Sequence, residues 1–187
     1  MVKGKYPVMV QFLTLLLTLG LITHLYALTV ARASLQELTE ESSIVVAGKV
    51  EQIKYEWGDR SSKVIHTKVT LSVNEQLKGQ NGSKIVFRQL GGKMGDFGMD
   101  VPGTPQFRIG DEVILFLVEH KAAYWIHSIA LGCYHVSTAE DGQQIVFNNL
   151  GDINVVDPAT RQPVSREQVN TPQPRNEFIQ RIQSYLE

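Results

Sequence analysis

The chain has 187 residues, a formal net charge of −1 and a single cysteine; 43% of its residues are hydrophobic and 20% are charged. This length is typical of one domain, and the composition excludes a disordered chain and a polytopic membrane protein. One cysteine excludes an intrachain disulfide and a cysteine-based zinc cluster. The near-balanced charge argues against a generally basic, nucleic-acid-binding surface.

Residues 1–33 predict a secretory signal peptide. Lys3 and Lys5 form its basic start, an apolar run follows at residues 8–30, and residues 31–33 (Ala-Arg-Ala) match a small-x-small cleavage pattern. The alternative is an uncleaved N-terminal anchor, because an apolar run of this length can span a bilayer. In both cases the basic end stays inside, and the rest of the chain is exported to a periplasmic or extracellular location.

Removal of this leader changes the charge of the protein. Residues 1–33 contain three basic residues and no acidic one, so the remaining 154 residues carry 15 basic and 19 acidic side chains, a net charge of −4. An exported domain of this size can bury a core without a disulfide. Because phosphate contacts require a basic face, we expect no nucleic-acid partner, and an oligonucleotide-binding barrel is a disfavoured alternative.

The first predicted elements of the exported part are a short helix and three strands. Ser34 and Glu37 form a capping pattern that predicts a helix over Ser34–Ser42. Apolar and polar residues then alternate with period two, which predicts strands with one buried face, and Gly48 indicates a bulge in the first of them. The strands are expected at Ser43–Tyr55, Lys63–Leu77 and Lys84–Leu90, with turns at 56–62 and 78–82.

Residues 91–110 are rich in glycine and proline and have no period, which predicts a long loop. A continuous apolar run then predicts a central strand buried on both faces, and shorter segments predict three further strands. These four strands are expected at Asp111–Glu119, Tyr124–Ala130, Cys133–Thr138 and Gln143–Phe147.

The C-terminal part is predicted to be a polar, proline-containing connector over residues 151–174, with a helical turn near Ser165, followed by a terminal helix within residues 175–187. The apolar residues of that helix share one face, so we expect it to pack back on the sheet. Together the elements predict a mainly β protein: an antiparallel, partly open Greek-key (OB-like) barrel over residues 34–150, with a short N-terminal helix and a C-terminal helix.

The glycine-rich loop is the strongest candidate binding site. Methionine and phenylalanine exposed on such a loop are unusual without a partner, so we predict that Lys93, Met94, Phe97 and Met99 make binding contacts. The alternative is that these apolar side chains fold inward and cover the barrel. The two readings differ in whether the loop stands clear of the barrel or caps it.

No catalytic motif is present, and we expect neither a cofactor nor a bound metal. Cys133 and His135 point to the same face of a predicted strand, and His127 is near enough to meet them across a hairpin. A metal- or thiol-dependent enzyme is therefore the alternative class, although a buried, inert thiol is the simpler interpretation. Aromatic residues such as Tyr55 and Trp57 are typical of core packing, with a ligand face as the alternative.

Several segments together resemble a bacterial exported β-domain that occurs alone or beside secreted matrixin-like metalloproteases. These segments are Ser43–Val50, Thr67–Val73, Leu77–Gly79, Gln89–Gly95, Val101–Phe107 and Gly110–Leu117. They cover about residues 35–150 and are more distantly similar to the barrel of tissue inhibitors of metalloproteinases and netrin modules. Ser34 stands where those inhibitors have a zinc-reaching cysteine, so their inhibitory chemistry is not implied.

The resemblance implies an association with a secreted protease and assigns no activity. Together with the candidate loop at 91–110, it predicts an exported, non-enzymatic binding domain. The expected partner is an envelope or secreted protein, and membrane contact is expected only through residues 8–30 if the leader is uncleaved.

Overall fold

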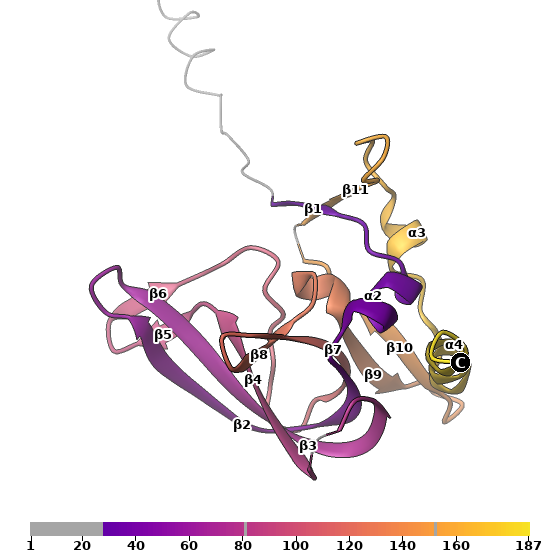
Figure 1. Ribbon diagram of the computed structural model, residues 1–187, viewed down its shortest axis with the longest axis horizontal. Helices are drawn as coiled ribbons and strands as arrows, with labels where there is room; N and C mark the ends of the chain where they lie inside the picture. Colours follow the sequence, from indigo (N-terminus) through magenta and orange to yellow (C-terminus); the bar gives the residue numbers. More distant parts are fainter. Residues whose placement is uncertain (1–27, 81, 152) are drawn as a thin grey trace, which may run out of the picture.

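The computed structural model describes residues 28–80, 82–151 and 153–187. This part of the chain is mainly β, with one large mixed sheet, two small sheets and three α-helices (Figure 1). The strands are β1 (Thr29–Ala31), β2 (Ile44–Asp59), β3 (Val64–Lys78), β4 (Lys84–Leu90), β5 (Gly92–Met94), β6 (Phe97–Met99), β7 (Glu112–His120), β8 (Ala123–Ile126), β9 (Cys133–Thr138), β10 (Gln144–Asn148), β11 (Asn154–Val156) and β12 (Gln173–Pro174). The helices are α2 (Leu35–Glu41), α3 (Arg166–Val169), α4 (Arg175–Ser184) and the 3-10 helix η1 (Ile129–Gly132).

The large sheet has the strand order β12-β10-β9-β7-β2-β3-β4-β8, and β8 also pairs with β7. β8 follows β7 across a tight turn and runs antiparallel to it, whereas β8 runs parallel to β4. The pairings therefore run β2-β3-β4-β8-β7 and back to β2, a circuit of five strands. In a circuit with an odd number of strands, at least one pair of neighbours must be parallel. The prediction of a purely antiparallel sheet is wrong for this reason, because the sheet is mixed.

The central strands β2 and β7 are buried on both faces. In β2 this holds for residues 44–47, and in β7 it holds for residues 113–117, as the continuous apolar run predicts. One face contributes to a core cluster with β3, β4 and Cys133, and the other packs against α2, α4 and β10. The strand predicted at Asp111–Glu119 is thus confirmed as a central one.

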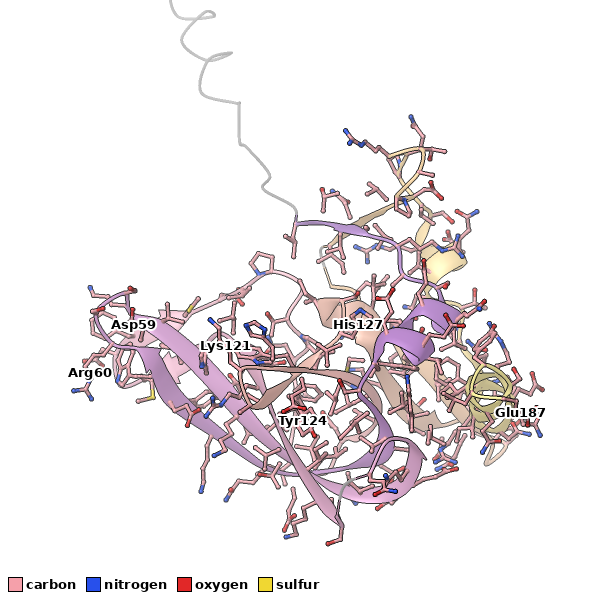
Figure 2. All side chains as sticks on the ribbon, viewed as in Figure 1. Asp59, Arg60, Lys121, Tyr124, His127 and Glu187 are labelled. Atoms are coloured by element: carbon pink, nitrogen blue, oxygen red, sulfur yellow. The ribbon has the colours of Figure 1, made fainter. Side chains whose placement is uncertain are left out.

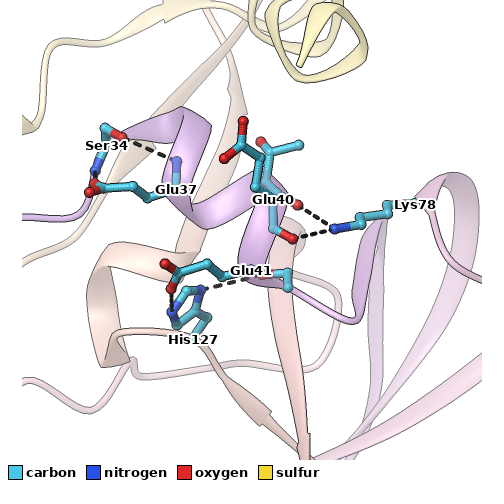
Figure 3. Close-up of polar contacts among 8 residues, drawn as sticks. Ser34, Glu37, Glu40, Glu41, Lys78 and His127 are labelled. Atoms are coloured by element: carbon cyan, nitrogen blue, oxygen red, sulfur yellow. Dashed lines mark hydrogen bonds and ion pairs between the residues drawn. The ribbon is translucent and has the colours of Figure 1, made fainter. Parts of the chain in front are cut away.

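Two helices cover the second face of the central strands. The N-terminus of α2 has the predicted capping box, in which Ser34 and Glu37 exchange hydrogen bonds. At its C-terminus Lys78 donates to the carbonyl oxygens of Thr39 and Glu40 at 2.8 and 2.7 Å (Figure 3), which satisfies groups that a helix end leaves unpaired. α4 lies along the same face with Phe178 buried, so the predicted packing of the terminal helix is confirmed.

Several element boundaries differ from the sequence-based prediction. β2 extends to Asp59 rather than ending at Tyr55, so the turn shortens to residues 60–63. The strand predicted at Tyr124–Ala130 ends at Ile126, because Ser128 and the residue after it have positive φ and start η1. The bulge expected at Gly48 is confirmed by a register shift between β2 and β3.

The predicted connector over residues 151–174 contains more regular structure than expected. β11 lies within it and pairs in parallel with β1, while α3 forms the expected helical turn near Ser165. Ile153 and Val155 belong to a third core cluster, against which Leu28 and Val30 pack. All described residues of the predicted leader, 28–33, therefore contact the domain, through strand pairing, core packing and the hydrogen bond from the Arg32 N–H to the Val156 carbonyl.

The first 27 residues, with most of the predicted signal peptide or anchor, lie outside the described residues. Within the part that the structure describes, no helix is both long and apolar enough to cross a membrane.

Candidate functional site

The far end of the β2–β3 ribbon carries the candidate site. Figure 2 shows Asp59 and Arg60 at this end, remote from His127 and from Glu187 at the C-terminus. The turn that closes the ribbon is held by the Asp59 carboxylate, which accepts hydrogen bonds from the backbone N–H and the hydroxyl of Ser61 at 3.0 and 2.7 Å. Hydrogen bonds from Ser62 and Ser61 hold the pKa of Asp59 below its usual value, so the turn stays ordered by a charged acceptor.

The predicted loop begins with a hairpin that lies on this ribbon. β5 and β6 pair antiparallel (Figure 1), which corrects the expectation of a loop without regular structure. Two bonds fix its base: the Gly91 N–H donates to the Ile65 carbonyl at 2.9 Å, and the Thr67 hydroxyl donates to the Gly91 carbonyl at 2.7 Å. Gly92 has φ +131°, and a Cβ there would lie 2.5 Å from the Tyr55 ring. Only glycine allows this close approach.

The four predicted contact residues share the hairpin but differ in exposure. Met99 and Met94 are half-buried, and the sulfur of Met99 lies 3.4 Å from the Ile65 backbone nitrogen, within hydrogen-bonding distance. Lys93 is exposed, and the Phe97 side chain is 48% exposed. Lys93 and Phe97 are therefore the two exposed members of the set. Because Phe97 pairs with Met94 across the hairpin, its ring lies on the same face as the two methionines, and Lys93 lies on the opposite face.

Phe97 meets two residues of the ribbon end. Its ring packs edge-on against Trp57, with centroids 6.1 Å apart, and the Lys63 ammonium lies 4.8 Å from the ring centroid. Such a cation–π contact holds the phenyl ring without covering it. Tyr55, also 48% exposed, lies beneath the hairpin. We call the surface formed by Tyr55, Trp57, Lys63, Lys93 and Phe97 the distal tip.

Sequence reasoning found only part of the distal tip. Phe97 and Lys93 are exposed candidates by composition, and Tyr55 and Trp57 are the aromatic residues for which a ligand face was the alternative. Lys63 carries no local signal, because only the register of β2 and β3 brings the start of β3 to the hairpin. Its positive φ of 55° marks it as a turn residue.

The second half of the predicted loop covers the core. Phe107 packs edge-on against Phe87, with ring centroids 5.5 Å apart, and the Gln89 amide donates to the Pro105 carbonyl at 2.9 Å. A small cavity of about 70 Å³ remains between this segment and the ribbon. The second half of the loop therefore covers the core, and binding through the residues of the first half stays a prediction.

The alternative thiol site has a different environment. Cys133 is buried in the first core cluster, with its sulfur 4.0 Å from His135 Nε2. Burial, reinforced by the charge of Asp111, raises the pKa of the Cys133 thiol far above its usual value. A nucleophilic cysteine requires the thiolate, so this thiol is neutral at physiological pH.

His127 lies apart from Cys133, beside α2. Its Nε2 is 3.4 Å from the Glu41 carboxylate and its Nδ1 is 3.5 Å from the Ser42 hydroxyl (Figure 3). Among the described residues, no three histidine, cysteine, aspartate or glutamate side chains group closely enough to hold a metal ion. His127 thus has a local partner on the helix rather than on β9.

The environment of His135 predicts an acid-sensitive step in stability. Burial lowers the pKa of His135 from its usual value near 6.5, although Asp111 opposes the shift. As the pH falls below about 6.5, the unfolded chain takes up this proton before the folded one does, so the free energy of unfolding falls, and the fall stops below the folded-state pKa. The steepest slope that one proton allows is about 1.4 kcal/mol per pH unit.

Urea denaturation between pH 7.5 and pH 5 measures this slope. We expect His135→Gln to flatten it and His120→Gln, at the exposed end of β7, to leave it unchanged. An equal slope in wild type and His135→Gln would contradict the assignment to His135.

No protein-family model and no characterised protein sequence matches the chain significantly. The distal tip therefore has to be interpreted from its own residues.

Proposed function

We propose that the chain is an exported, non-catalytic binding domain that recognises a partner protein with the distal tip. The carrying observation is the 48% exposure of Phe97 on a hairpin held firmly at its base by Gly91 and Thr67. Aromatic side chains presented on a rigid support bind partners at a low entropic cost. Lys63 places a cation over the ring, and the exposed Lys93 and Asp96 of the same hairpin add one charge of each sign, so the surface suits a partner with polar groups around an apolar contact.

The barrel architecture is part of the proposal. Five strands pair in a circuit, β2-β3-β4-β8-β7 and back to β2, and five is the strand number of the partly open Greek-key OB-fold. The first core cluster would then be the barrel interior, with Phe107 of the loop covering one opening. In this reading the long β2–β3 ribbon is an extension that carries the distal tip away from the barrel.

Export and the partner class rest on the sequence. The basic start and apolar run within residues 1–33 support export, and the resemblance to domains found beside secreted matrixin-like metalloproteases supports a protease or another envelope or secreted protein as partner. The resemblance is to the domain, and the contact surface is proposed from Phe97 and its neighbours alone.

The alternatives have weaker support. For an oligonucleotide, the sheet offers Lys84 and Arg88 of β4, yet each already forms an ion pair with a glutamate of β2, Glu51 and Glu56 respectively, which reduces the charge available for phosphate contacts. For a thiol-dependent enzyme, the buried and neutral Cys133 would first have to become exposed.

Binding to the distal tip is tested with a pair of matched truncations. We expect Phe97→Ala to lower retention of a partner from the envelope and secreted fractions of the host by about tenfold or more, as for an exposed aromatic hot spot. Val86→Ala removes a comparably exposed apolar side chain on β4 and is expected to retain the partner. Retained proteins are identified by mass spectrometry and then re-bound in purified form.

Equal binding by wild type and Phe97→Ala would contradict the role of the distal tip. Purified matrixin-like metalloprotease serves as the first defined partner, and failure of the wild type to bind it would remove that partner class while leaving the surface open to others.

A further inference from the structure

A second pocket lies at the other end of the molecule, beside the helices. It has a volume of about 470 Å³ and is enclosed by the segment 32–36, by Tyr134 of β9 and by the α3 and α4 region. This volume is within the range of small-molecule sites. Its lining includes two arginines, Arg32 and Arg181, and contains no aspartate or glutamate.

The positive charge of these arginines is largely unpaired. Arg181 donates to the side-chain oxygen of Gln173 at 2.9 Å, and within the described ranges neither arginine forms an ion pair. A guanidinium has five N–H donors, so most donors of these two exposed groups have no acceptor among the described residues and remain available to a ligand or to water. The lining therefore combines an excess of donors with an excess of positive charge.

Two carboxylates interact electrostatically with Arg32, and both accept hydrogen bonds from other groups. Glu37 accepts from the Ser34 backbone N–H at 2.7 Å in the capping box of α2, and Asp157 accepts from the Thr160 backbone N–H at 2.8 Å. The charge of Arg32 lowers the pKa of both carboxyl groups, but in each case hydrogen bonds are the larger cause. Neither carboxylate belongs to the pocket lining.

The rest of the lining is mixed, with polar side chains such as Gln168 and Thr171 beside aromatic and apolar ones. The rings of Phe178 and Tyr134 lie with centroids 4.4 Å apart, and Leu35 and Val169 continue the surface. Burial raises the pKa of Tyr134 to about 12, and the charge of Arg181 opposes that rise, which indicates that the guanidinium is close to the phenol. Tyr134 is therefore a neutral hydroxyl beside a cation.

We propose that this pocket binds an organic anion in which one carboxylate, sulfonate or phosphate group is carried on an aromatic or aliphatic body. The anionic group pairs with Arg32 and Arg181, because planar guanidinium groups bind such oxyanions through two parallel hydrogen bonds. The body lies against the partly exposed Tyr134 and Tyr185 rings, which both line the pocket. This site is separate from the distal tip, and in its complete form it requires a chain that retains Arg32.

Three probes separate the parts of this recognition. Isothermal titration calorimetry of the purified full chain measures the affinity for each of three ligands. 2-Naphthoate is an anion on an apolar body, 2-naphthamide is the apolar body without the charge, and acetate is the anion without the body. We expect 2-naphthoate to bind at least about tenfold more tightly than either of the others, since both the charge and the body contribute. Equal binding of 2-naphthamide, or no binding of 2-naphthoate, would overturn the proposal.

Matched variants then assign the site. Arg181→Gln and Arg32→Gln are each expected to weaken 2-naphthoate binding by about tenfold or more, and Arg60→Gln, in the turn at the opposite end of the molecule, is expected to have no effect. Circular dichroism confirms that each variant is folded. Unchanged affinity in both pocket variants, or an equal loss in Arg60→Gln, would show that the anion binds elsewhere and overturn the assignment.

Discussion

Phe178→Ala is expected to lower the free energy of unfolding by about 3–5 kcal/mol. The Phe178 side chain on α4 is 0% exposed, and its ring centroid lies 4.4 Å from that of Tyr134 and 6.4 Å from that of Phe116. Its removal leaves a cavity between the helix and the sheet, because strand-borne rings cannot move far enough to fill it. Urea denaturation followed by far-UV circular dichroism measures the loss.

Phe97→Ala is the matched control, because it removes the same atoms from an exposed position. Its cost is expected to stay within about 1 kcal/mol, the value of one edge-on aromatic contact with Trp57. A loss below 1 kcal/mol in Phe178→Ala would contradict the docking of α4. A loss of 3 kcal/mol or more in Phe97→Ala would mean that the distal tip is part of the folding core rather than a surface held ready for a partner.

The elements that sequence predicts best are those whose own residues contain the signal. The bounds of β4 and β9 agree with the prediction to the residue, because alternating side chains are flanked by turns on both sides. β7 is predicted as a central strand from its unbroken apolar run, because a strand needs apolar residues at consecutive positions only when both of its faces are buried. α4 is predicted from four apolar residues on one helical face, Phe178, Ile179, Ile182 and Leu186, of which the first three are buried in the structure.

The missed elements depend on partners far away in the chain. β5 and β6 are three residues each and contain glycine, so no alternation is visible, and their hairpin forms because its base bonds to Ile65 and Thr67. The parallel contact between β4 and β8 joins Phe87 to Tyr124 across the whole loop. No local pattern encodes such a pairing, which follows from the path of the chain around the sheet.

The candidate site divides in the same way. Phe97 and Lys93 were found because an exposed aromatic ring on a glycine-rich loop is unusual in itself. Lys63 was missed because its position over the Phe97 ring depends on the register of β2 and β3. The pocket beside the helices has no sequence signal of its own, since Arg32 lies in the predicted leader and Arg181 in the predicted terminal helix, 149 positions apart.

A chain that begins at Ser34 is expected to be about 2 kcal/mol less stable than one that begins at Leu28. The longer chain contains β1, whose residue Val30 packs with Leu28 against the third core cluster, and each side chain is half-buried. Burial of a whole Leu or Val side chain contributes about 1.5–3 kcal/mol, so two half-buried ones contribute about 2 kcal/mol. Urea denaturation of both chains gives the difference.

Val30→Ser in the longer chain distinguishes the contribution of the side chain to stability from that of the backbone pairing of β1. It removes apolar contact while β1 keeps its backbone bonds, such as the one from the Asn154 N–H to the Leu28 carbonyl at 2.8 Å, so an intermediate stability is expected. Equal stability of all three chains would show that β1 contributes nothing to the fold.

This comparison bears directly on the leader. Cleavage after Ala33 would remove β1 and also Arg32, and with them the strand partner of β11 and one cation of the helix-side pocket. In the anchor alternative, Thr29 and Val30 cannot lie in a bilayer while they pair with β11, so the predicted span of residues 8–30 is too long at its C-terminal end. The intact mass of the protein isolated from its host decides between cleavage and retention of the leader. A chain that starts at Ser34 requires a domain that is stable without β1. A large loss of stability on that truncation therefore argues that residues 28–33 are retained.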